Sequence, residues 1–321
     1  MSADVENMFS VKEVPWHKLG SVIQNAPSIE EGIKLAGLNW KVAMETTHRP
    51  DGTLRASKSV IRLSDNKVLG EVGPKYHPLQ NEKAFAFFEP FIKSGEVSLE
   101  TAGSLDGGRK IWVLAQLNRK PLDIGGGDEV RKMLLLTNRH DGVASAMVGF
   151  TPIRVVCANT LAAAISATDS ALLRVRHTAG IETGLDKIQE MVNTANQQFE
   201  ATGEMYKAMA RYGVSTADVK KYVKLVFYPN ISDTEITERQ QTRLTMLTEN
   251  ITKLFETGFG ADLKSANGTM WGLYNGMTQY LSHEAKDDSD KRFDSLWFGT
   301  NKNVNAHAMS VAVKMAAGGA V

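Results

Sequence analysis

The chain has 321 residues, of which 42% are hydrophobic and 23% charged, with a formal net charge of +1 at neutral pH. This composition is typical of a globular protein whose length allows one large domain or two ordinary ones. The near-neutral charge excludes a chain that attracts polyanions over its whole surface. We find no secretory signal at the start and no apolar run long enough to span a membrane, so we expect a cytoplasmic protein without a membrane partner.

The first predicted element is a short helix that follows an N-terminal arm, and together they occupy residues 1–37. Ser28 is a favourable N-cap, and Glu30 and Glu31 place acidic groups in the first turn, where the helix dipole stabilises them. Gly37 is expected to end the helix, because glycine readily adopts the left-handed conformation that follows many last turns.

Alternating apolar and polar residues then predict a β-meander, with strands over residues 40–47, 56–63 and 68–72. A loop follows in which prolines flank Tyr76 and His77, and a binding role for these side chains is an alternative to a structural one. Phenylalanines at helical spacing predict a helix over residues 82–93 with its aromatic side chains in the core.

Two hairpins form the centre of the predicted sheet. The first joins strands over residues 97–105 and 109–117 through an Asp-Gly-Gly turn, and Asp141-Gly142 forms the turn of the second. Between the hairpins, residues 125–127 are three glycines, which we interpret as a flexible linker rather than a phosphate loop because no Lys-Ser/Thr follows. The second hairpin comprises strands over residues 133–137 and 143–148, followed by an apolar run at 150–157 and a helix from residue 161.

From residue 181 the composition changes to amphipathic helices, which we expect over residues 182–210, 217–226, 234–256, 265–281 and 304–315. The predicted fold class is therefore α+β, with an antiparallel meander and hairpin sheet, packed helices, and a mainly helical C-terminal region. The predicted domains are an α+β core at 38–180 and a helical region at 181–321 packed on it.

No residue pattern indicates a catalytic or metal site. The seven histidines show no recognised metal-ligand spacing, and the serines show no nucleophile elbow. Cys157 is the only cysteine, which excludes an intrachain disulfide, and its apolar neighbours favour a small buried residue. We therefore predict no catalytic residue, no metal and no cofactor.

Basic groups interleaved with aromatic faces instead favour nucleic acid. Residues 101–178 hold ten Lys and Arg against six Asp and Glu. Stacking combined with backbone charge is the usual way to hold a single strand without reading its sequence. The candidate nucleic-acid-binding residues are Arg109, Lys110, Trp112, Arg131, Lys132, Arg139, His140, Arg154, Asn159, Arg174 and Arg176. The alternative is an ordinary solvated sheet face with a core tryptophan.

Within this set we expect Arg139 and Arg154 to be the strongest charged contacts, since a guanidinium donates two parallel hydrogen bonds to phosphate. Arg139 lies in the predicted hairpin turn and Arg154 on the strand that leads into the helix. The alternative for Arg154 is a buried ion pair with Asp141.

Four stretches together resemble the phage/plasmid-like protein family, a large domain family of unknown function found on phages, plasmids and prophage islands. They are residues 16–20 (WHKLG), 138–142 (NRHDG), 151–161 (TPIRVVCANTL) and 268–275 (GTMWGLYN). The family usually has Ala-Val after the last motif, where this chain has Gly276-Met277. The resemblance implies a mobile-element setting and no catalytic assignment. The element order is also loosely similar to that of RecT/Redβ-type single-strand annealing proteins, which is an architectural analogy only.

These observations favour a homo-oligomeric protein that binds or anneals single-stranded DNA and acts in recombination or protection of mobile-element DNA. One alternative is an enzyme acting on nucleic acid or nucleotide, with a site formed by Asn138, His140, Asp141, Cys157 and Asn159. A second alternative is a host-interaction or inhibitor protein that works through its helical half.

Overall fold

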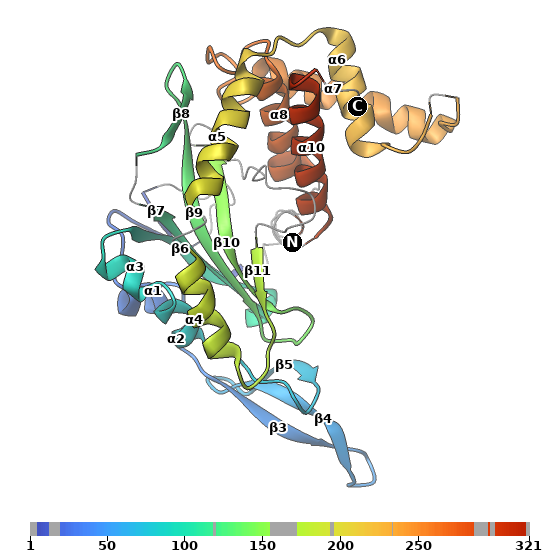
Figure 1. Cartoon of the computed structure of the whole chain (residues 1–321). Helices are drawn as coiled ribbons and strands as arrows, with labels where there is room; N and C mark the ends of the chain where they lie inside the picture. The colour runs from blue at the N-terminus through green and yellow to red at the C-terminus, as the bar shows by residue number, and fades with distance from the viewer. Residues whose placement is uncertain are drawn as a thin grey trace. The chain divides into compact units, whose positions relative to one another are not determined.

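The computed structural model describes residues 5–12, 20–117, 120–154, 172–192, 196–232, 234–285, 295 and 299–318 (Figure 1). The chain divides into two compact units. Unit 1 comprises Met1–Arg119, Met133–Phe150 and Leu172–Ala195, and unit 2 comprises Lys120–Lys132, Thr151–Ala171 and Asn196–Val321. The two units interleave along the chain, whereas the sequence predicted consecutive domains at 1–37, 38–180 and 181–321.

The main sheet has eight strands in the order β11-β10-β9-β7-β6-β1-β2, with β8 paired to β9. They are β1 (Val5–Val11), β2 (Ser21–Ile23), β6 (Val97–Leu105), β7 (Lys110–Leu117), β8 (Leu122–Gly125), β9 (Asp128–Arg139), β10 (Ala146–Arg154) and β11 (Leu172–Val175). Among the pairs with a described register, β1–β2 is parallel and the others are antiparallel. The predicted α+β class with an antiparallel sheet is therefore confirmed.

A separate three-stranded sheet contains the predicted meander, in the order β3-β4-β5. Its strands are β3 (Val42–His48), β4 (Leu54–Arg62) and β5 (Lys67–Val72). Because β5 pairs with β4 only from Lys58 to Arg62, the outer part of β3 and β4 continues beyond it as a projecting hairpin (Figure 1). The sequence placed these strands in one sheet with the rest, and the structure corrects this.

The helices of unit 1 are α1 (Ile29–Leu35), α2 (Asn81–Ala86), α3 (Glu89–Lys93) and α4 (Ile181–Val192). A capping box forms the start of α1, where Ser28 and Glu31 bond to each other's backbone N–H groups. The apolar core joins Phe85 and Phe88 of the helical segment to Leu134 and Leu136 of β9. These helices therefore mark the face of the sheet to which the even-numbered residues of β9 point.

Unit 2 is mainly helical, with α5 (Asn196–Arg211), α6 (Thr216–Phe227), α7 (Glu238–Thr257), α8 (Met270–Gln279), a π-helical turn η2 (Tyr280–Glu284) and α10 (Thr300–Ala316). Every residue of α8 is buried, and the helix packs against α5, α7 and α10. Gly272 permits the preceding segment to lie close against α8, because a Cβ there would lie 1.9 Å from the Ala266 carbonyl oxygen. No helix in the described part of the chain is both long and apolar enough to cross a membrane.

Several predicted boundaries change. The helix expected at 82–93 is divided into α2 and α3, and the one expected at 182–210 becomes α4 and α5. The expected linker at 125–127 is a hairpin turn in which all three glycines have positive φ angles. The two strands expected at 143–148 and 150–157 are one strand, β10, as far as residue 154. The helix expected from residue 161 lies outside the described residues.

A buried polar cluster as the candidate functional site

The turn after β9 is held by an ion pair between residues two apart. Arg139 Nε donates to Asp141 Oδ1 at 3.0 Å, and Arg139 Nη2 donates to Asp141 Oδ2. Asp141 Oδ1 also accepts from the backbone N–H of Val143 at 3.0 Å. Burial raises the pKa of Asp141, but the hydrogen bonds from Arg139 and Val143 outweigh it, so the pKa lies below its ordinary value. Asp141 is therefore an ionised group that shapes the turn.

His140 lies inside this turn with no exposed surface. Its Nε2 is 2.9 Å from Asn81 Oδ1, while Asn81 Nδ2 donates to the Leu38 carbonyl at 3.0 Å. Since the amide oxygen can only accept, His140 carries its proton on Nε2 and leaves a lone pair on Nδ1. The Trp40 ring lies 5.3 Å from the imidazole and closes one side of the cluster.

His177, two residues beyond β11, is arranged in the same way. Its Nδ1 is 3.2 Å from the His77 carbonyl oxygen, so the proton is on Nδ1 and the lone pair on Nε2. The Tyr76 ring stacks on this imidazole with 4.7 Å between centroids. Tyr76 in turn donates its hydroxyl to the Arg139 carbonyl at 3.1 Å, which ties the loop to the turn.

Both histidines are neutral at physiological pH. Burial, and to a smaller extent a positive charge on His177, lowers the pKa of His140 to about 3 against the opposing charge of Asp141. Burial also lowers the pKa of His177, against the hydrogen bond to the His77 carbonyl and the charge of Asp141. Each imidazole therefore presents a lone pair rather than a second N–H group.

Three buried acceptors of this cluster have no hydrogen-bond partner among the described residues: His140 Nδ1, His177 Nε2 and Asn138 Oδ1. Asn138 Nδ2 donates to the Leu79 carbonyl at 3.3 Å, so the Oδ1 of the same amide is the atom without a partner among the described residues. A buried polar atom without a partner costs about 1–3 kcal/mol. The cluster therefore offers acceptors, and it suits a species that donates hydrogen bonds or accepts electron pairs.

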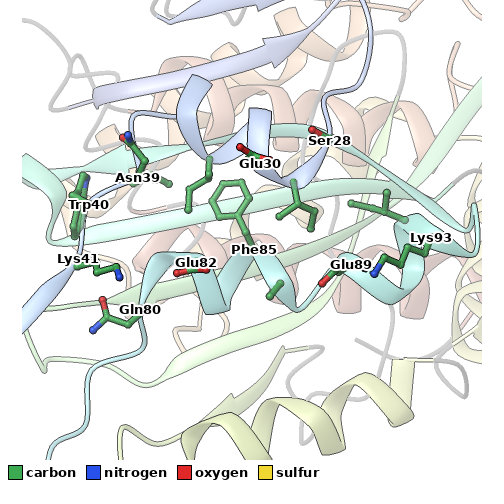
Figure 2. A pocket seen from close by; sticks show the side chains of 15 residues that line it. Ser28, Glu30, Asn39, Trp40, Lys41, Gln80, Glu82, Phe85, Glu89 and Lys93 are labelled. Carbon is green, nitrogen blue, oxygen red and sulfur yellow. Dashed lines mark ion pairs between the residues drawn. The ribbon is translucent and has the colours of Figure 1, made fainter.

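A groove lies beside the cluster, between α1 and the α2–α3 segment, with a volume of about 590 Å³ (Figure 2). Phe85 lies at its centre, with Ser28 and Glu30 on one side and Glu82 and Glu89 on the other (Figure 2). The rim charges are partly neutralised, since Glu30 pairs with Lys34 at 2.8 Å and Glu89 with Lys93 at 2.7 Å.

Trp40 and Gln80 line the groove, and Trp40 also contacts the cluster. The Gln80 side chain accepts from the Val42 N–H at 3.1 Å and donates to the Val42 carbonyl at 2.9 Å, which attaches α2 to the start of β3. Trp40 contacts His140 from the groove side. Within unit 1, the groove and the cluster therefore share a wall.

Four predicted nucleic-acid-binding residues are instead buried: Lys110, Trp112, Lys132 and His140. Trp112 is 3% exposed and lies over Gly103, which leaves no ring face for a base. Arg139, expected to be a leading phosphate contact, is 16% exposed and engaged by Asp141. These five residues are corrected from surface contacts to parts of the scaffold.

The other predicted nucleic-acid-binding residues are exposed or half-buried, or they lie outside the described residues. Arg109, Arg174 and Arg176 are exposed, and Arg109 pairs with Asp106 at 3.5 Å. Arg131 is half-buried, and its Nε has no partner in the described part of the chain. The side chain of Arg154 and the whole of Asn159 lie outside the described residues, and the carboxylate expected to bind Arg154 is held by Arg139.

The alternative enzymatic set is only partly assembled. Asn138 and His140 belong to the cluster, but Asp141 is committed to the turn, and Cys157 and Asn159 lie outside the described residues. No group of three or more His, Cys, Asp or Glu side chains in the described ranges is placed to hold a metal ion.

The last of the four family-like stretches, at 268–275, has a structural role. Trp271 Nε1 and Ser265 Oγ donate to the buried carboxylate of Asp128 at 2.8 and 2.7 Å, and Tyr274 donates to Asn305 Oδ1 at 3.0 Å. These bonds join α8 to the start of β9 and to α10 inside unit 2.

Comparison with protein families matches residues 68–308 to a family described as a domain of unknown function, DUF932. The chain belongs to this family. No curated protein and no solved structure matches the chain. The DUF932 match contains Asn81, Asn138, His140 and His177 but begins after Trp40. Membership of a family of unknown function is thereby confirmed, while a mobile-element origin and a likeness to annealing proteins stay predictions.

Sequence reasoning missed Asn81 and His177 as members of the cluster. Asn81 directly precedes the helix expected at 82–93 and carried no signal of its own, and His177 was one of seven histidines without a recognised metal-ligand spacing. The proline-flanked pair Tyr76 and His77 was the one signal in that region, and the structure shows that this loop holds His177 by hydrogen bonding and stacking.

Proposed function

We propose that this DUF932 protein binds single-stranded nucleic acid through phosphate contacts, with little reading of base sequence. The observation that carries the proposal is the exposed pair Arg174 and Arg176 on and just beyond β11, which ends the order of described strands in the main sheet. Arginine suits phosphate because its planar fork donates two parallel hydrogen bonds. Phosphate contacts supply most of the affinity in binding without sequence specificity.

The β3–β4 hairpin of the same unit supports this proposal. It projects beyond β5 and carries Arg49 and Arg55 at exposed positions (Figure 1). Asp51, the acidic group at its tip, is occupied by bonds from the Thr53 N–H and hydroxyl at 2.9 and 2.6 Å. A β-ribbon with exposed arginines has the size and chemistry to follow a nucleic-acid backbone.

The burial of Trp112 changes the predicted mode of binding. Without this ring as a stacking platform, affinity rests on charge and falls steeply as salt is added. The setting implied by the sequence resemblance, recombination or protection of mobile-element DNA by a homo-oligomer, is part of the same proposal. The structural alternative for these arginines is that exposed charges at a sheet edge prevent the edge strand from pairing with strands of other molecules.

A titration of dye-labelled single-stranded DNA, followed by fluorescence anisotropy at low salt, tests the proposal. We expect the double variant Arg174→Gln/Arg176→Gln to bind roughly tenfold more weakly, which corresponds to about 1.4 kcal/mol. The matched control is Lys34→Gln/Lys93→Gln, which removes the same charge from α1 and α3 and should bind as the wild type does.

Parallel arms with unlabelled duplex and with added Mg²⁺ separate the alternatives. If unlabelled duplex competes as well as unlabelled single strand, the protein has no preference for single strands. Degradation of the labelled strand when Mg²⁺ is added supports the alternative of an enzyme acting on nucleic acid. Absence of binding at low salt overturns the proposal and leaves the arginines as edge protection.

A further inference from the structure

The histidines of the buried cluster share a hydrogen-bonding pattern that is characteristic of metal ligands. His140 donates its Nε2–H to Asn81 Oδ1, and His177 donates its Nδ1–H to the His77 carbonyl. A metal-ligating imidazole almost always donates its other N–H to an amide, carbonyl or carboxylate oxygen, which fixes the tautomer and directs the lone pair. Both imidazoles are held in this way, and both remaining nitrogens are buried and without a partner among the described residues.

Sheet topology brings these nitrogens to one place. Asn138 follows Leu134 and Leu136 on the face of β9 that forms the apolar core, and His140 continues from the end of that strand. β10 lies between β9 and β11, and Ala146 pairs with Val175 where β11 ends, two residues before His177.

All three polar side chains are therefore at the same end of the sheet, and Val175 and Ala146 belong to the same core as Leu136. Ala146 leaves more room there than a larger side chain would. Tyr76 stacks on His177 and donates its hydroxyl to the Arg139 carbonyl, which links His177 to the residue before His140.

The composition of the cluster selects the kind of occupant. His140, His177 and Asn138 offer two imidazole lone pairs and an amide oxygen, without a free donor. Asp141, whose negative charge acts on both histidines, is bound by Arg139 and is also within the influence of the Lys110 charge. Imidazole nitrogen is the ligand preferred by zinc, copper, nickel and ferrous ions, whereas magnesium and calcium prefer oxygen.

We propose that His140 Nδ1 and His177 Nε2 bind a divalent transition-metal ion of the zinc class, with Asn138 Oδ1 as the third protein ligand. Two histidines and an amide are too few for a closed structural site, so at least one position stays open to water or to a substrate. This site is independent of the nucleic-acid surface proposed above. Local sequence patterns pointed only to Asn138 and His140, because Asn81 and His177 lie in distant segments of the chain.

The test uses the full-length protein, stripped with a chelator and titrated with Co²⁺ and separately with Zn²⁺. We expect one equivalent of Co²⁺ to give visible absorption bands typical of nitrogen and oxygen ligation. One equivalent of Zn²⁺ should bind in calorimetry and raise the melting temperature. Absorption bands typical of thiolate ligation would assign the metal to Cys157 and contradict the proposal.

Variants locate the ion. His177→Gln should lose at least tenfold in Zn²⁺ affinity while keeping its circular dichroism spectrum. Asn81→Ala removes the acceptor of the His140 N–H and should weaken binding by about 10- to 100-fold, the usual effect of losing such a partner. His77→Gln is the matched control, because His77 contributes only its backbone carbonyl to the cluster and its exposed side chain lies outside it.

Two results overturn the proposal. One is a folded wild-type protein that binds neither Co²⁺ nor Zn²⁺ at micromolar concentration, which would leave the acceptors to an ordered water. The other is a folded His177→Gln variant with unchanged affinity. Should a variant fail to fold, the wild-type titration still decides between metal and water.

Discussion

Arg62 shows how a single side chain can hold the small sheet to its surroundings. Its Nε and Nη2 donate to Asp65 at 2.9 and 2.6 Å, its Nη1 donates to Glu6 at 2.7 Å, and the Trp40 ring lies 5.3 Å from its guanidinium carbon. The side chain is 7% exposed. Because Trp40 also packs on His140, the position of this arginine bears on the candidate site.

We predict that Arg62→Lys lowers the free energy of unfolding by about 1–3 kcal/mol, since a lysine cannot reproduce the fork that bonds two carboxylates. Urea denaturation followed by circular dichroism measures the change. The matched control is Arg55→Lys in the same sheet, whose pair with Glu71 spans 3.6 Å between exposed side chains and should matter by less than about 0.5 kcal/mol. Equal effects of the two substitutions would contradict this role of Arg62.

The pH dependence of stability reports the same contact. Hydrogen bonds from Arg62 lower the pKa of Asp65 to about 2. A carboxyl group whose pKa is lower in the folded state stabilises the fold above its unfolded pKa, about 3.9, and loses this effect as the pH falls toward the folded value. Asp65→Asn should therefore destabilise the protein most at neutral pH, and the difference from wild type should shrink between about pH 4 and pH 2. A constant difference would disprove the linkage.

At the scale of elements, local signals predicted most helices and strands, and the misses have physical causes. Pro90 near the start of α3 divides the helix expected at 82–93, because proline is favoured in the first turn and cannot donate further along. The sequence also divided β10 after residue 148, whereas the structure shows one strand through Pro152. Among the described residues β11 pairs with β10 at Ala146–Gly149, so Pro152, which has no N–H to donate, lies beyond that pairing. The hairpin between β8 and β9 was missed as well, because the first part of β9 is charged and did not show the apolar pattern of a strand.

The close packing of α8 gives a prediction at this scale. Gly272→Ala places a Cβ against the Ala266 carbonyl, so we expect a loss of about 1–3 kcal/mol in unfolding free energy. Gly213→Ala is the matched control in the same unit, since a Cβ there meets nothing within 4 Å. Thermal and urea denaturation compare the two variants, and similar stability would contradict the packing role.

At the scale of the whole molecule, the interleaved units could not be read from the sequence. Residues 120–132 join the helical unit through bonds such as Trp271 to Asp128, which connect distant positions. The candidate site also depends on contacts between distant segments. Asn138 and His140 lie in a stretch whose polar residues attracted attention in the sequence, but Asn81 and His177 come close to them only when the chain is folded. Local patterns predict elements, whereas contacts between distant segments depend on how those elements pack.

Self-association is a further prediction at this scale. Leu63 and Val68 are 52% and 50% exposed near the β4–β5 turn, where a second copy could cover them. We expect a multimer at micromolar concentration in light scattering, and a smaller species for Leu63→Ser/Val68→Thr. Leu54→Ser, at a 62% exposed position in the projecting hairpin, is the control. A strict monomer with and without DNA would favour the enzyme or inhibitor reading.

The salt dependence of binding tests the central claim most directly. If the protein holds a single strand by its phosphates, the logarithm of the binding constant falls linearly with the logarithm of salt concentration, by about 0.7 for each contact. Arg174→Gln/Arg176→Gln should then reduce the slope by about 1.4, from two lost contacts of about 0.7 each, while Lys34→Gln/Lys93→Gln leaves it unchanged. Identical slopes for wild type and the arginine variant would contradict the account.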